Sequence, residues 1–106
     1  MPTNIKRLLA ELKMGLAELY GQRLKAVYVF GSYARGDYDE SSDLDVMIVI
    51  SDYENYGAEI DKSGELVSYL SLEYGISISR VIMKEIQWKE SDTLLLRNIR
   101  AEGVPV

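Results

Sequence analysis

Residues Val27 to Ile50 read VYVFGSYARGDYDESSDLDVMIVI, and the two apolar runs at the ends of this segment predict two strands. The first, Val27–Phe30, is β-branched and aromatic and stops at a glycine, which is typical of a strand that ends in a tight turn. The second, Leu44–Ile50, is apolar on both faces beyond Asp45. We therefore predict that the second strand is central in its sheet and covered on both sides.

The glycine-serine pair after the first strand predicts a sharp corner. Gly31 lets the backbone come close to a ligand, and Ser32 adds a hydroxyl and an amide. Such a turn can hold phosphate oxygens, more so if it opens a short helix.

Two acids mark the start of the second strand. Because strand side chains alternate, we expect Asp43 and Asp45 to point to one face while Leu44 and Val46 point to the other. Two unpaired carboxylates at the mouth of an apolar strand repel one another, and a divalent cation between them removes the repulsion. Oxygen ligands favour Mg²⁺ or Mn²⁺.

Two other motifs fail at their essential positions. The spacing of the glycines after the first strand matches the start of a P-loop, but Asp37 and Tyr38 stand where the phosphate-binding Lys and Ser/Thr belong. The alternating acids that follow resemble an EF-hand loop, but Ser42 and Ile48 stand where that loop needs Gly and Glu.

The composition of the chain limits the kinds of catalytic and binding site that it can form. The chain has no cysteine and no histidine, which excludes disulfides, Cys/His zinc sites, thiol catalysis and serine-histidine machinery. Its net charge of −5 argues against strong, sequence-blind binding to nucleic acid and favours a basic partner. No apolar run long enough to span a membrane and no signal peptide is recognisable, so we expect a cytoplasmic protein that does not bind membranes.

The rest of the chain reads as one α/β domain over residues 1–106, without repeats or linkers. A helix from a Thr3–Asn4 cap to Gly21 and a helix that ends at Gly75 are expected to cover the sheet, the second with an irregular first half because of Gly64. The remaining predicted elements are a strand over Lys25–Phe30, a polar loop over Asp37–Ser42, a strand over Ile76–Met83, a helix from a Ser91 cap to Arg100, and a short edge strand over Val104–Val106.

The order Gly31-Ser32, ten residues, Asp43-x-Asp45, with Ala34-Arg35-Gly36 in between, resembles the signature of the DNA polymerase beta-like nucleotidyltransferase superfamily. More narrowly, it resembles the minimal nucleotidyltransferase (MNT) domains, which are about as short as this chain. The resemblance implies a small mixed β-sheet with helices packed on it.

The resemblance also implies roles for the site residues. Backbone amides around Gly31 and Ser32 would hold the β- and γ-phosphates of ATP. Asp43 and Asp45 would be the catalytic acids and the ligands of Mg²⁺ or Mn²⁺.

Arg35 is the nearest cation for the phosphate tail and has two interpretations. In one, it contacts the nucleotide. In the other, it forms an exposed ion pair with Asp37 or Asp39, as is common in such loops.

One feature departs from the resemblance. Many superfamily members carry a third carboxylate on the strand after the long helix, where it completes the metal site. Here Ser77 or Ser79 occupies the expected place, and Glu73 or Glu85 would reach the site only through a shifted register. Without this acid, we expect the metal that bridges the triphosphate to bind through Asp43 and Asp45, and the metal that activates the acceptor hydroxyl to be held less well.

The leading hypothesis is a Mg²⁺-dependent adenylyltransferase that transfers AMP from ATP to a hydroxyl of a partner HEPN-domain toxin, and so acts as an antitoxin. The alternative is a non-catalytic antitoxin that keeps the fold and binds the toxin. A third hypothesis is a subunit that binds a small substrate such as an aminoglycoside. A homo-oligomer is a further hypothesis, because Leu94–Leu96 has more apolar residues than one helix face can bury.

Overall fold

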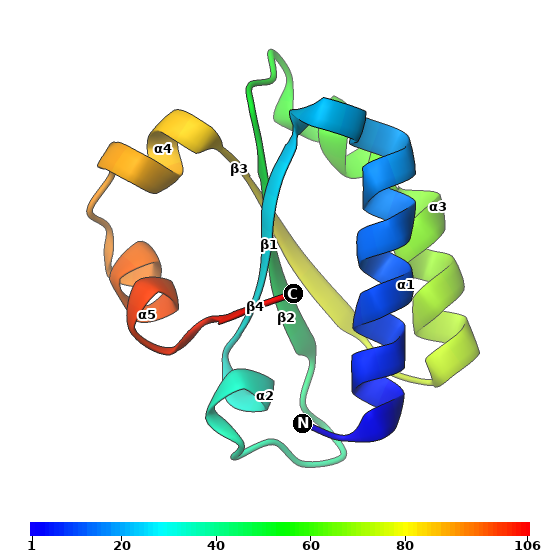
Figure 1. The fold of residues 1–106 in the computed structure, drawn as a ribbon. Helices are drawn as coiled ribbons and strands as arrows, with labels where there is room; N and C mark the ends of the chain where they lie inside the picture. The colour runs from blue at the N-terminus through cyan, green and yellow to red at the C-terminus, as the bar shows by residue number, and fades with distance from the viewer.

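The computed structural model describes all residues from 1 to 106 and contains one mixed four-stranded sheet in the order β3-β2-β1-β4 (Figure 1). β2 runs parallel to β3 and antiparallel to β1, and β1 pairs antiparallel with β4. This architecture confirms the predicted small mixed sheet with packed helices. The elements in chain order are α1 (Thr3–Tyr20), the 3₁₀ turn η1 (Gly21–Arg23), β1 (Leu24–Phe30), α2 (Ser32–Arg35), β2 (Leu44–Ile50), α3 (Tyr56–Tyr74), β3 (Ile78–Lys84), α4 (Glu85–Glu90), α5 (Leu94–Glu102) and β4 (Val104–Pro105).

β2 is the central strand, as predicted. It lies between β1 and β3, and every one of its residues except Asp45 is buried. A strand covered on both faces needs apolar side chains at even and odd positions, which explains its unbroken apolar run.

The long helices α1 and α3 cover one face of the sheet (Figure 1). The apolar stripe of α1 is buried, with Leu8, Leu12 and Leu16 fully inaccessible to solvent. These leucines pack with Leu44, Val46, Ile48 and Ile50 of β2 in the main hydrophobic core.

The short helices α4 and α5 lie over the opposite face (Figure 1). Met47 and Val49 of β2 pack there with Leu96 and Ile99 of α5 in a second, smaller core. The ring of Trp88 on α4 lies 5.1 Å from the ring of Tyr28, centroid to centroid. The two faces of β2 are therefore buried in two separate clusters.

Helix α4 was not predicted. It is only six residues long, and its two large apolar residues, Ile86 and Trp88, are two positions apart and so form no helical stripe. Accordingly, Ile86 is exposed while Trp88 is half-buried. Its first turn is held by the Gln87 side chain, which accepts a hydrogen bond from the Lys84 amide at 3.0 Å.

The expectation of an irregular first half for the second long helix was wrong. Asn55 caps α3, its Oδ1 accepting from the Ala58 amide at 2.9 Å, and the helix is continuous from Tyr56. Gly64 lies beside the guanidinium of Arg80, which donates to Ser63 Oγ at 2.9 Å and to the Ile60 carbonyl at 2.8 Å. These hydrogen bonds from β3 stabilise the turn that the glycine weakens.

Two predicted caps also differ. Pro2 precedes α1 without a side-chain cap, so Thr3 and Asn4 lie inside the helix. Thr93, not Ser91, caps α5, and its hydroxyl accepts from the Leu96 amide. None of the helices combines the length and the apolar character needed to cross a bilayer.

Candidate functional site

The corner between β1 and α2 depends on a glycine. Gly31 has φ 73° and ψ −152°, a backbone conformation that is almost confined to glycine. Helix α2 begins directly after it at Ser32, so the amides at the start of this helix have no acceptor within the helix itself. The corner therefore opens a short helix, the case in which such a turn holds phosphate oxygens better.

Asp45 lies against this corner. Antiparallel pairing of β1 with β2 sets Phe30 opposite Asp45. A Cβ atom at position 31 would collide with Asp45 Oδ2, so only glycine leaves room for the carboxylate. Gly31 is therefore needed for the close approach of Asp45, which follows the 37–43 loop, as well as for the turn itself.

The alternation of Leu44, Asp45 and Val46 follows the prediction. Leu44 and Val46 point into the main core under α1 and α3. Asp45 is half-buried and lies on the opposite face, which it shares with Met47. Asp43 is exposed and precedes the strand by one residue.

The electrostatics of the acid pair are unfavourable without a cation. Burial raises the pKa of the Asp45 carboxyl, the nearby charge of Asp43 raises it further, and Arg35 lowers it. Asp43 is thus close enough to repel Asp45, and Arg35 does not fully neutralise the pair. A bound divalent cation would reverse the balance by favouring both ionised forms.

Arg35 is held beside this site by two carboxylates. Its Nε donates to Asp37 Oδ2 at 3.1 Å, and its Nη1 donates to Glu102 Oε1 at 3.2 Å. The ion pair with Asp37 matches one of the two expected interpretations, while the effect of Arg35 on the pKa of Asp45 keeps the other open. Glu102 was not predicted at this site, because α5 brings it from 67 positions away.

The register of β3 identifies the residue that faces Asp45. Ser79 pairs with Asp45 in the parallel ladder and is exposed, whereas Ser77 precedes the strand. Glu73 lies in α3 and Glu85 begins α4, so neither is on β3. The shifted register that would bring a third acid to the site is absent.

The acid pair suits magnesium as a ligand set. No group of three or more acidic, histidine or cysteine side chains in the chain could enclose a metal by itself. Mg²⁺, however, commonly binds through one or two carboxylates and completes its octahedron with water and substrate phosphates. Asp45 against the corner, together with Asp43 two residues before it, supplies that minimal set.

A polar cleft of about 580 Å³ opens next to Asp43. One wall is the Asp39–Ser42 loop, and the other includes Tyr33 and Tyr38, whose rings are stacked with centroids 4.3 Å apart. No local sequence pattern indicates that these two rings pair. The stack gives the cleft an aromatic side wall.

Comparison with known proteins identifies the family of this chain. The sequence profile of the nucleotidyltransferase domain family matches residues 9–103. The chain belongs to this family. It is 40% identical over 103 residues to a Methanocaldococcus jannaschii protein named "Putative protein adenylyltransferase MJ0141", an alignment that covers 97% of this chain and 99% of the relative. It is 32% identical over 92 residues to the protein adenylyltransferase MntA of Thermococcus cleftensis, covering 87% of each chain.

Solved structures share the fold of this nucleotidyltransferase. A structure described as a minimal nucleotidyltransferase superposes with a TM-score of 0.61 at 23% identity, covering 95% of this chain and 94% of the other. A toxin-antitoxin crystal structure with AMP-PNP superposes with a TM-score of 0.62 at 20% identity, covering 89% and 68%. The fold and the enzyme class expected from the sequence are thus confirmed.

Proposed function

We propose that this nucleotidyltransferase is a Mg²⁺-dependent adenylyltransferase that transfers AMP from ATP to a hydroxyl of a partner HEPN-domain toxin, and that it serves as the antitoxin. The observation that carries this proposal is the position of Asp45, which Asp43 precedes by two residues, against a glycine corner that opens a helix. Relatives named protein adenylyltransferases support the choice of AMP. A structural neighbour that contains a tri-AMPylated HEPN toxin with an MNT antitoxin supports the choice of partner.

The reaction is an in-line substitution at phosphorus. The acceptor oxygen forms a bond to the α-phosphorus of ATP, the bond from that phosphorus to the bridging oxygen breaks, and pyrophosphate leaves. The hydroxyl proton passes to a carboxylate or to water. The enzyme contributes mainly by positioning the reactants and by stabilising charge.

Each site residue has a role in this scheme. Amides at Gly31 and Ser32 hold the β- and γ-phosphates, and Arg35 neutralises part of the negative charge of the triphosphate. Asp43 and Asp45 hold Mg²⁺, which when bound neutralises charge on the triphosphate and the departing pyrophosphate. Asp45, raised in pKa by burial and by Asp43, also stands closest to the corner.

The partner supplies the acceptor site. We treat residues 1–106 as one minimal domain, whose elements form the sheet and its two helical layers. The acidic net charge of −5 suits association with a basic, RNA-directed protein. Because ATP is the donor, we place the reaction in the cytoplasm.

The test mixes the purified chain with the protein encoded beside it, ATP labelled at the α-phosphorus, and Mg²⁺. We expect label on the neighbouring protein and none when Asp43→Asn and Asp45→Asn are combined. Absence of label, under conditions in which the chain binds a non-hydrolysable ATP analogue and a related adenylyltransferase labels its own partner, would contradict the proposal.

A second function, neutralisation by binding alone, is favoured by one observation. Ser79 faces Asp45 where a third carboxylate would complete the site. Toxicity assays in cells separate the two functions. Combined Asp43→Ala and Asp45→Ala should abolish neutralisation if transfer is needed and leave it intact if binding suffices.

A further inference from the structure

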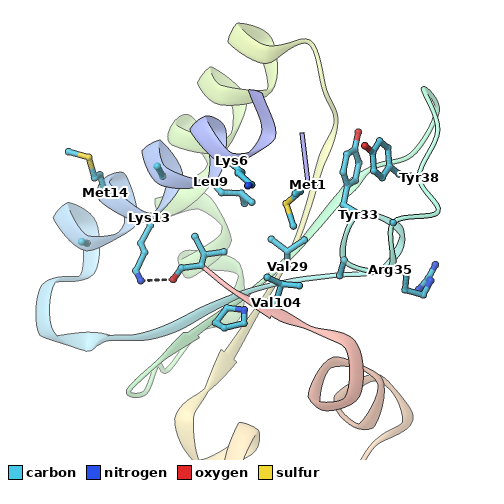
Figure 2. Close-up of a pocket in the computed structure, with 16 residues that line it drawn as sticks. Met1, Lys6, Leu9, Lys13, Met14, Val29, Tyr33, Arg35, Tyr38 and Val104 are labelled. Carbon is cyan, nitrogen blue, oxygen red and sulfur yellow. Dashed lines mark hydrogen bonds between the residues drawn. The ribbon is translucent and has the colours of Figure 1, made fainter. Parts of the chain in front are cut away.

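An apolar groove of about 860 Å³ lies between α1, α2 and the C-terminal strand β4 (Figure 2). Leu9 and Met14 of α1 line it on one side, and Val29 and Val104 line it on the sheet side. None of the acids of the candidate site lines this groove. Arg35 is the one predicted site residue that lines the groove, and the transfer reaction does not explain the apolar residues around it.

The groove concentrates exposed apolar side chains. Met14 is 68% exposed, Met1 41%, Val104 38% and Tyr38 37%. Single exposed apolar residues are ordinary on a protein surface, but several gathered around one groove indicate a binding surface. The two methionines are flexible and polarisable, and such residues are used where a surface adapts to a bound helix.

The charged side chains that line the groove are all cations. Lys6 and Lys13 come from α1, and Arg35 comes from α2 (Figure 2). Lys13 donates to the Val106 carbonyl at 2.5 Å, whereas Lys6 makes no hydrogen bond or ion pair to another side chain. Arg35 is already paired with Asp37 and Glu102, so the two lysines of α1, with no acidic side chain among the lining residues, make the α1 side of this groove locally basic in a chain of net charge −5.

An added strand is a poor occupant for this surface. The edge strand β4 has only two residues, and one of them is Pro105, which has no N–H to donate. A helix needs no backbone partners and can lay an apolar stripe between flanking charges.

We infer that this groove, defined by α1, α2 and β4, is the docking site for an amphipathic helix of a partner protein, with carboxylates on both sides of its apolar stripe. The stripe covers Met14 and Val104, and the carboxylates face Lys6 and Lys13. The inference rests on the proposed function in that the acceptor is a protein, and it places the carboxylates on one helix of a partner that is basic overall.

The groove and the candidate site share a wall. Tyr33 and Tyr38 line both the groove and the cleft beside Asp43. A partner held by its helix in the groove is thus anchored one aromatic layer away from the cleft beside Asp43. Docking at this distance lets the same partner place a hydroxyl at the site, at a high effective concentration.

The test uses fluorescent helical peptides as probes and the full chain without ATP or Mg²⁺. One peptide carries a leucine stripe flanked by glutamates, and its match carries the same stripe flanked by lysines. We expect the acidic peptide to bind at least about tenfold more tightly in fluorescence anisotropy, with the difference shrinking as salt is raised.

Matched variants locate the binding surface. Lys6→Glu and Met14→Asp should each weaken binding of the acidic peptide by about tenfold or more. Lys62→Glu and Leu72→Asp make the same kinds of change at exposed positions on α3, away from the groove, and should leave it unchanged. Circular dichroism of all four variants checks that they fold.

Several results would overturn the inference. The first is equal affinity of the chain for the two peptides. The second is a loss of peptide affinity as large in the α3 variants as in the groove variants. The third is a dimer of this chain that Met14→Asp dissociates, because it would assign the groove to a second copy. Because nucleotide is omitted, failure of AMP transfer with intact peptide binding would reject only the proposed function.

Discussion

Replacing Gly31 by alanine tests the corner on which the site depends. The native φ of 73° and ψ of −152° lie in a region that costs a residue with a Cβ on the order of 1–3 kcal/mol. In addition, the new Cβ would meet Asp45 Oδ2, so the carboxylate must turn away from the corner. Gly31→Ala should therefore reduce both stability and ligand binding.

The chain offers a matched control at Gly21. This residue has φ 56° and ψ −129°, close to the conformation of Gly31, but a Cβ added there would meet no atom within 4 Å. Gly21→Ala should therefore carry a similar backbone strain without disturbing Asp45.

Two measurements separate strain from collision. Urea unfolding followed by Trp88 fluorescence should show a loss of about 1–3 kcal/mol in both variants. Calorimetric titration with Mg²⁺ and a non-hydrolysable ATP analogue should show a loss of about tenfold to a hundredfold in affinity for Gly31→Ala alone, since a lost charged contact is worth about 1.5–3 kcal/mol. Nucleotide affinity unchanged in Gly31→Ala, or reduced equally in Gly21→Ala, would contradict this explanation of the corner.

Three further predictions concern the acid pair and the core. The pKa of Asp45 is raised in the folded state, so the stabilisation from its protonated form is present at low pH and is lost as pH rises through that pKa. Asp45→Asn should therefore increase the free energy of unfolding relative to wild type at pH 7, with a smaller difference near pH 4. The same substitution should remove Mg²⁺-dependent nucleotide binding. Ser79→Asp should strengthen Mn²⁺ binding on the order of tenfold by adding a carboxylate ligand, which a titration followed by electron paramagnetic resonance would detect and which an unchanged affinity would contradict. Leu12→Ala, at a fully buried position, should cost about 2–5 kcal/mol in urea unfolding, whereas Leu72→Ala, at a position 85% exposed, should cost almost nothing.

The features that the sequence predicted well share a strict local pattern. The leucine stripe of α1 has helical spacing, and β2 is apolar at every position except Asp45. Alternation then places Asp45 on the face opposite Leu44 without further information. Strand pairing was needed to show that Ser79, and not Ser77, faces Asp45.

The features that were missed depend on contacts between distant segments. Arg80 occupies an ordinary alternating position on β3, and only packing reveals its hydrogen bonds to the turn of α3 around Ser63. Glu59 is buried beside Arg23, with 3.2 Å between Oε1 and Nη2, although it reads as a surface residue of a helix. No pattern within a short window distinguishes such residues from exposed charges.

Paramagnetic Mn²⁺ reports the position of a bound metal residue by residue, and this chain is small enough for complete assignment of its amide resonances. With a non-hydrolysable ATP analogue present, we predict that the first amide signals to broaden are those of Gly31, Ser32, Asp45 and Ser79, and that Asp43→Asn with Asp45→Asn abolishes the effect. Broadening centred on the Asp37–Glu40 loop instead, or undiminished in the double variant, would contradict the assignment of the metal-nucleotide site to the glycine corner and its acid pair.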